Sequence, residues 1–157
     1  MFGGGHVGMM GAVADAALSA GGEVIGVIPE GLMRREPACE ELTRLIVTAS
    51  MHERKQRMAD LSDGFMALPG GFGTFEEFCE IVTWAQLGVH QKPCGLLDVG
   101  GYYAPLLAMF DHALAEGFVQ PVHYSLVLAN ADPAALLSRM QTWQAPPLKR
   151  WLSPDAA

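Results

Sequence analysis

The sequence predicts an α/β protein with an open parallel sheet and helices on both of its faces. Three observations predict this class. Short apolar runs typical of strands alternate with helical patterns along the chain. The runs are almost entirely apolar, as in strands that are covered on both faces. Glycine clusters stand where strands end and helices begin. Alternating strands and helices form right-handed βαβ units, so the predicted architecture is Rossmann-like, with ligands beyond the carboxyl ends of the strands.

The first half of the chain contains two complete predicted strands, each with a helix before it or after it. A helix with apolar residues at helical spacing ends at a glycine pair, which is a typical C-terminal signal. Ser50 and Glu53 are spaced as a capping box, which predicts that the second helix begins there. The predicted helices are Gly5–Ala20 and Ser50–Ser62, and the predicted strands are Glu23–Pro29 and Leu45–Thr48.

The second half repeats the alternation three times. Each apolar run is followed by a glycine or proline signal and then by a helical pattern. The predicted strands are Gly64–Leu68, Gly95–Val99 and Leu126–Ala129, and the predicted helices are Thr74–Leu87, Tyr103–Glu116 and Pro133–Thr142. Met1–Phe2 has the character of a strand end, and we expect a preceding βαβ portion of roughly 30 residues or more.

The composition fits one core-rich globular domain. The 157 residues are 50% hydrophobic and 17% charged, against roughly 25% charged in typical domains. We expect a single nucleotide-binding domain over residues 1–144 and a flexible C-terminal tail over residues 145–157, where three prolines occur. The net charge of −7 argues against nucleic acid or an anionic membrane surface as a partner.

Cysteine usage and hydropathy indicate a cytoplasmic location. The three cysteines are an odd number, and they follow no basic leader segment, which favours reduced thiols. No uncharged apolar run reaches the ~18 residues that a membrane span needs. His6, His52 and His90 have no partner at metal-ligand spacing, so the sequence predicts no metal site.

The segment Leu68–Glu77, LPGGFGTFEE, is the most specific motif. A strand stops at Pro69, and three glycines then allow a ligand to approach the backbone closely. The free amides and positive end of the following helix favour an anion, most naturally phosphate. The motif lacks the Gly-Lys-Ser/Thr of a Walker loop. The alternative interpretation is a tight turn with a Thr74–Glu77 capping box.

Two further segments carry candidate functional residues. The cluster Gly3–Gly11 repeats the strand–glycine–helix arrangement, although such a loop can also serve helix–sheet packing. Arg54 and Lys55 stand early in a predicted helix, where the dipole disfavours cations, so a compensating anion is expected. The alternative is a solvated helix face, above all for Lys55. Glu36 follows the strand Glu23–Pro29 on the ligand side.

With these segments assembled, the chain resembles the LONELY GUY (LOG) family of cytokinin riboside 5′-monophosphate phosphoribohydrolases, often labelled lysine decarboxylase-like. The family motif PGGxGTxxE matches Pro69–Glu77, and its Arg-Lys pair before a methionine matches Met51–Met58. The motif GGGxxGxMG matches Gly3–Gly11, and both Thr83–Gly88 and Gly101–Tyr103 also look like the family. The resemblance runs from about Phe2 to Ala129, without the family's first strand, the helix that follows it and most of the second strand.

The resemblance implies hydrolysis of the N-glycosidic bond of a nucleoside 5′-monophosphate. The implied substrate is an N6-substituted AMP such as isopentenyladenosine monophosphate, or AMP, and the products are the free base and ribose 5-phosphate. Arg54 and Glu77 are the implied catalytic pair. The implied substrate-binding residues are Gly4, Gly5, Glu36, Lys55, Gly70, Gly71, Phe72, Gly73, Thr74, Phe75, Glu76 and Thr83.

The resemblance also implies no metal and no redox cofactor, and a homodimer or higher homo-oligomer. We expect the helix Thr74–Leu87 and its neighbours to form the interface, because shared apolar faces suit a chain so poor in charge. One alternative is a nucleotide or molybdenum-cofactor carrier of the same fold without hydrolysis. True lysine decarboxylation is disfavoured, because that chemistry needs a lysine that holds pyridoxal phosphate. Neither Lys55 nor Lys92 stands in a supporting context.

Overall fold

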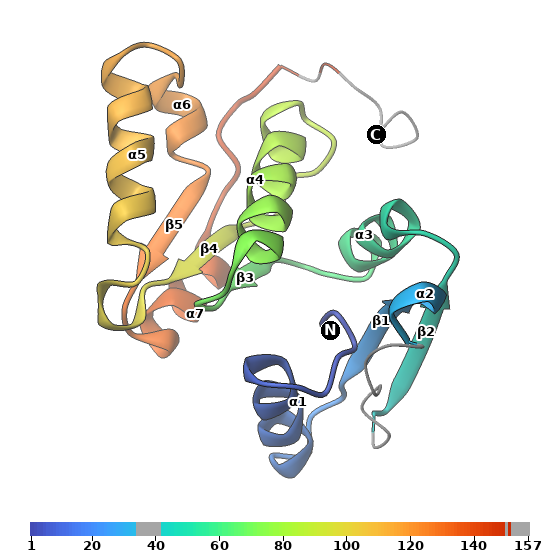
Figure 1. Cartoon of the computed structure of the whole chain (residues 1–157). Coiled ribbons are helices and arrows are strands. Elements are labelled where there is room, and N and C mark those ends of the chain that lie inside the picture. Colours follow the sequence, from blue (N-terminus) through green and yellow to red (C-terminus); the bar gives the residue numbers. More distant parts are fainter. Residues whose placement is uncertain (34–41, 150, 152–157) are drawn as a thin grey trace. The chain divides into compact units, whose positions relative to one another are not determined.

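The computed structural model describes residues 1–33, 42–149 and 151, which fall into two compact units (Figure 1). Unit 1 is Met1–Ser62 and unit 2 is Asp63–Ala157. Each unit contains its own parallel sheet, with two strands in unit 1 and three in unit 2. The units are described separately below.

The sheet of unit 1 pairs β1 (Ile25–Pro29) with β2 (Arg44–Thr48) in parallel. Phe2 forms a parallel bridge with Gly26 at the other edge of β1. Its amide donates to the Ile25 carbonyl at 2.9 Å, and its carbonyl accepts from the Val27 amide at 3.0 Å. The strand character predicted for Met1–Phe2 is therefore confirmed as local pairing. The helices are α1 (Met9–Ser19), α2 (Glu30–Met33) and α3 (Met51–Asp60).

Helix α3 begins as the capping-box spacing predicts, with one difference. The Ser50 Oγ accepts a hydrogen bond from the Glu53 amide at 3.2 Å. The Glu53 carboxylate accepts in turn from the amide of Ala49 at 2.9 Å, one residue before the Ser50 amide that a standard capping box uses. Two backbone donors at the helix entry are satisfied, which fixes the start of the helix that carries Arg54.

The sheet of unit 2 has the strand order β3–β4–β5, and every pairing is parallel. Its strands are β3 (Phe65–Ala67), β4 (Cys94–Leu97) and β5 (Val127–Asn130). Its helices are α4 (Phe72–Gln86), α5 (Ala104–Ala115), α6 (Pro121–Tyr124) and α7 (Pro133–Thr142), with a 3-10 turn, η1, at Val99–Gly101.

Both faces of the unit 2 sheet are covered by helices. Cys94 and Leu96 point to one face and pack with Phe78 of α4, together with partly buried residues of α5. Leu97 points to the opposite face and packs with Leu136 of α7. This alternation follows from the two-residue period of a strand. The predicted α/β class, with parallel strands and helices on both faces, is confirmed (Figure 1).

The observed elements depart from the sequence predictions at several boundaries and in three short elements. Helix α1 begins at Met9 and not at Gly5, and Val99, predicted as the end of a strand, lies in η1. Helix α4 begins at Phe72 and not at Thr74. The short elements α2, η1 and α6 were not predicted, because three or four residues are too few to show a helical period. None of the helices within the described ranges combines the length and apolar character that a membrane span requires.

Candidate active site

The loop Leu68–Gly71 joins β3 to α4 and turns tightly around Gly70. A Cβ atom at Gly70 would collide with the hydroxyl and the Cβ of Thr74. Only glycine lets the backbone pass this close to Thr74. Gly71 is the N-cap of α4, and its carbonyl accepts from the amides of Thr74 at 3.0 Å and Phe75 at 3.1 Å.

The start of α4 corrects the capping-box interpretation of this motif. No side chain caps the helix, because Thr74 is its third residue and lies against Gly70. The amides of Phe72 and Gly73 occupy the first two helical positions, where no carbonyl within the helix can accept them. Phe72 is 92% exposed, and its ring meets that of Phe75 edge-on at 6.4 Å.

The two glutamates of the motif stand in the second turn of α4. The first turn contains no acidic residue, so the helix start presents its amides and positive dipole end without a carboxylate from its own first turn. Glu77 follows Gly73 by four residues and therefore lies on the same helix face, half-buried. Glu76 is exposed, and Thr83 follows it by seven residues on its face. The Thr83 hydroxyl donates to the Cys79 carbonyl at 2.7 Å.

Arg54 joins α3 to the first glycine cluster within unit 1. Its guanidinium is buried, with the residue only 9% exposed. The Nε donates to the Val27 carbonyl of β1 at 3.1 Å, and the Nη2 donates to the Gly3 carbonyl at 3.5 Å. A Cβ atom at Gly3 would overlap Nη2. The structure thus explains one glycine of the cluster by the close approach of a buried arginine.

The other predicted site residues of unit 1 differ in burial and in the helix face or loop on which they lie. Gly4 and Gly5 are buried, and Gly4 has a φ of 79°, which favours glycine. Lys55 is half-exposed, one position along the helix from Arg54 and therefore on a different face. Glu36 lies outside the described residues. Among the residues that the structure describes, no group of three histidine, cysteine, aspartate or glutamate side chains could hold a metal ion.

The structure gathers the predicted site residues into two groups, one in each unit. Unit 1 brings Arg54 together with the first glycine cluster, and unit 2 brings Gly70–Gly73 together with Glu77 on one end of α4. The pairing of Arg54 with Glu77 in one reaction stays a prediction.

Two tyrosines that the sequence analysis gave no role contact the glycine loop. Tyr102 and Tyr103 follow β4, and their hydroxyls donate to the carbonyls of Gly70 and Leu68. The signal available in the sequence was the glycine–tyrosine–tyrosine run at Gly101–Tyr103, whose partners depend on the tertiary structure.

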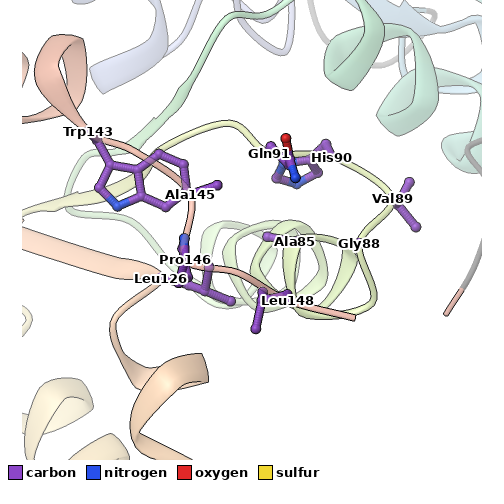
Figure 2. Close-up of a pocket in the computed structure, with 10 residues that line it drawn as sticks. All are labelled: Ala85, Gly88, Val89, His90, Gln91, Leu126, Trp143, Ala145, Pro146 and Leu148. Atoms are coloured by element: carbon purple, nitrogen blue, oxygen red, sulfur yellow. The ribbon is translucent and has the colours of Figure 1, made fainter. Parts of the chain in front are cut away.

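A cavity of about 290 Å³ lies at the opposite end of α4 (Figure 2). It contains none of the predicted site residues. The ring of His90 borders it and accepts from the Lys92 amide at 3.1 Å, while its other nitrogen lies 2.9 Å from the Ile81 carbonyl. Burial lowers the pKa of His90. The other residues that line the cavity are Ala85, Gly88, Val89, Gln91, Leu126, Trp143, Ala145, Pro146 and Leu148.

Comparison with known proteins gives consistent matches over most of the chain. A family model described as "Possible lysine decarboxylase" matches residues 10–140. The chain is 49% identical, over 91% of its length, to the probable cytokinin riboside 5′-monophosphate phosphoribohydrolase LOGL9 of Oryza sativa subsp. japonica. It is 48% identical over 94% of its length to LOGL5 of the same plant, which is described in the same words. It is also 45% identical over 91% of its length to the cytokinin riboside 5′-monophosphate phosphoribohydrolase LOG1 of Arabidopsis thaliana.

The matched region is a part of each relative. It covers 63% of LOGL9, 60% of LOGL5 and 67% of LOG1. The chain therefore spans somewhat less than two thirds of the length of the two rice proteins.

Proposed function

Because the chain belongs to the LOG family of cytokinin riboside 5′-monophosphate phosphoribohydrolases, we propose that it hydrolyses the N-glycosidic bond of a nucleoside 5′-monophosphate. The products are the free base and ribose 5-phosphate. The proposed substrate is an N6-substituted AMP such as isopentenyladenosine monophosphate, or AMP. One observation carries the proposal: α4 opens on Gly71, Phe72 and Gly73 without a carboxylate in its first turn.

The proposed phosphate site is the loop Gly70–Gly73 at the start of α4. Backbone amides at a helix N-terminus and the positive dipole end together bind anions. Binding energy from this phosphate, which does not itself react, can serve the reacting centre at the ribose. Thr74, Phe75 and Glu76 adjoin the loop as proposed substrate contacts, and Gly4 and Gly5 form a second proposed phosphate-binding loop.

Glu77 is proposed to act at the anomeric carbon. Its position one helical turn beyond Gly73 supports this role, because one turn rises about 5.4 Å, similar to the separation of the 5′-phosphate and the anomeric carbon in a nucleotide. Cleavage transfers the bonding electron pair to the base nitrogen and develops positive charge on the ribose. A carboxylate there stabilises that charge or orients the attacking water, whose oxygen bonds to the anomeric carbon while a proton passes to the base.

Arg54 is proposed to clamp the phosphate or the ribose. Its contacts with Val27 and Gly3 support this role, since they fix the guanidinium where the first glycine loop begins. Glu36, Lys55 and Thr83 are proposed as further substrate contacts.

The direct test is base release by the purified full chain. The protein is incubated with AMP, isopentenyladenosine monophosphate and adenosine, and the free base and ribose 5-phosphate are followed by chromatography. We expect release from the monophosphates and not from adenosine, and its loss in Glu77→Ala.

Three outcomes would contradict the proposal. Tight nucleotide binding without release would favour a carrier. Equal release from adenosine would remove the role of the phosphate. An absorbance band of bound pyridoxal phosphate, together with consumption of lysine, would favour the decarboxylase description.

We also propose a homodimer or higher homo-oligomer in the cytoplasm. Exposed apolar side chains on each unit support self-association, among them Met9 at 52%, Met109 at 59% and Phe118 at 87%. Cys79 and Cys94 are free thiols, which fits a reducing compartment. A monomeric mass by light scattering would contradict the assembly.

A further inference from the structure

Two consecutive tyrosines donate hydrogen bonds to backbone carbonyls of the loop between β3 and α4. The Tyr103 hydroxyl donates to the Leu68 carbonyl at 2.5 Å, and the Tyr102 hydroxyl donates to the Gly70 carbonyl at 2.6 Å. Both donors come from the turn after β4, and both acceptors lie in the loop after β3. These carbonyls flank Pro69, so the two hydroxyls hold the loop on either side of the proline.

The turn that carries the tyrosines is itself fixed. Asp98 accepts from the Tyr103 amide at 2.6 Å, and its own amide donates to the Asn130 carbonyl of β5 at 2.9 Å. Gly100 and Gly101 have φ values of 61° and 75°, which allow the backbone to reverse before the tyrosines. The hydroxyls are therefore presented by a turn anchored to the sheet.

Aromatic packing adds to this anchorage. Tyr103 is 1% exposed, and its ring lies edge-on to Phe75 of α4 at 6.4 Å. The rings of Tyr102 and Tyr103 meet edge-on at 5.1 Å. Tyr102 is 46% exposed. Its hydrogen bond to the loop therefore does not depend on burial of its ring.

The hydrogen bond from Tyr102 decides which way the loop presents the Gly71 amide. A trans peptide is planar, and its C=O and N–H point in opposite directions. The Gly70–Gly71 peptide is trans. Because Tyr102 binds the Gly70 carbonyl, the Gly71 amide is directed away from the tyrosines. The Leu68–Pro69 peptide has no N–H, because its nitrogen belongs to proline. Its carbonyl, that of Leu68, accepts the hydrogen bond from Tyr103.

We propose that Tyr102 and Tyr103 are positioning residues of the phosphate-binding loop: Tyr102 orients the Gly71 amide toward the 5′-phosphate, and Tyr103 fixes the loop at Leu68, just before Pro69. The inference rests on the proposed function, because that function assigns the loop to phosphate. The Tyr102 hydroxyl occupies the carbonyl end of the Gly70–Gly71 peptide dipole, and the amide end of that peptide is left directed at the anion. Neither tyrosine touches the substrate in this role.

The test replaces each hydroxyl by hydrogen. In Tyr102→Phe and Tyr103→Phe we expect the affinities for AMP and for inorganic phosphate, measured by calorimetry, to fall about tenfold, as when one hydrogen bond to a charged group is misaligned. The affinity for adenosine, which lacks the phosphate, should stay unchanged. With phosphate bound, amide hydrogen exchange at Gly71–Gly73 should be faster in the variants than in the wild-type protein. A structural role alone would not separate AMP from adenosine.

Tyr124→Phe is the matched control. Its hydroxyl donates to Asp111 at 2.6 Å in the same unit, away from the loop. The control should alter neither phosphate affinity nor exchange at Gly71–Gly73. Because Tyr103 is buried and Tyr102 is half-exposed, Tyr102→Phe keeps the test valid where Tyr103→Phe unfolds the chain.

The outcomes separate this inference from the proposed function. Unchanged AMP and phosphate affinity in Tyr102→Phe, or equal losses for AMP and adenosine, overturns the inference even where base release is observed. Loss of AMP binding without adenosine loss supports the inference even where the wild-type protein releases no base. A wild-type chain that binds neither AMP nor phosphate overturns the inference.

Discussion

The Nε of Arg54 donates a hydrogen bond to the carbonyl of Val27 at 3.1 Å, across 27 positions of the sequence. This contact ties helix α3 to strand β1 within unit 1. The same guanidinium reaches Gly3. Arginine can make both contacts because its guanidinium carries several donors in a fixed plane, whereas lysine has a single nitrogen.

Arg54→Lys should therefore impair both stability and turnover. A lysine amine cannot bind the Val27 and Gly3 carbonyls in the same geometry, and a buried carbonyl left without its donor costs about 1–3 kcal/mol. We expect a lower midpoint of urea unfolding and at least about a tenfold loss of base release, the factor that one lost interaction of 1.4 kcal/mol gives. Arg57→Lys, an exposed change on the same helix, is the control. Equal effects of the two changes would contradict the assignment.

Gly3→Ala should disturb the same contact from the other side. The added methyl would overlap the Nη2 of Arg54, and overpacking of a filled site costs about 1–3 kcal/mol. Gly31→Ala is the control, because a Cβ at Gly31 in α2 would meet no atom within 4 Å. The midpoint of thermal unfolding of both variants is measured by scanning calorimetry. A Gly3→Ala protein as stable as Gly31→Ala would show that the guanidinium does not require this glycine.

The glycines of the proposed phosphate site, Gly70–Gly73, should separate into structural and ligand-facing positions. Gly70→Ala should destabilise the chain, because its methyl would collide with Thr74. A Cβ at Gly73 would lie in open space, and alanine in a helix is favoured over glycine by up to about 1 kcal/mol. We expect Gly73→Ala to fold at least as well as wild type but to bind AMP more weakly in calorimetry. Wild-type AMP affinity in Gly73→Ala would remove this residue from the phosphate site.

Glu77→Gln should lower kcat while leaving substrate affinity nearly unchanged. The amide keeps the size of the side chain but loses the negative charge that stabilises the ribose cation or orients water, and such groups contribute about a hundredfold or more. Steady-state release of base measures kcat, and calorimetry with AMP measures affinity. Glu116→Gln, at the exposed C-cap of α5, is the control. Turnover at the wild-type rate in Glu77→Gln would refute its catalytic role.

His90 should make the stability of the chain depend on pH. Burial lowers its pKa in the folded protein below the usual 6.5, so the unfolded chain binds the proton more readily. The neutral ring therefore contributes to the stability of the folded protein. This contribution is complete above pH ~6.5 and is lost as the pH falls toward the lower pKa of the folded state. The free energy of unfolding, measured in urea across this pH range, should depend less steeply on pH in His90→Gln than in the wild-type protein. The exposed His112→Gln should retain the slope, and an identical slope in all three proteins would contradict the prediction.

Most of the regular elements could be predicted from sequence, because their signals lie within a few residues. Helix α7 spans Pro133–Thr142 as predicted, since Pro133 sets its first turn and Asp132 caps it through the Ala135 amide. For α4, the sequence predicts a start two residues later than the one observed. The Thr74–Glu77 spacing matched a capping box, but the approach of Thr74 to Gly70 leaves Gly71 as the cap.

The sequence by itself determined the family motifs, the glycine turns and the parallel α/β class, because all of these depend on local spacing and apolar period. Only the tertiary structure decided what the key side chains bind. Arg54 meets Gly3 across 51 positions, and Tyr102 and Tyr103 meet the loop across 32 and 35. Such partners are set by strand register and by the turns that follow each strand, which bring distant carbonyls within reach of a donor, and no local pattern encodes that distance.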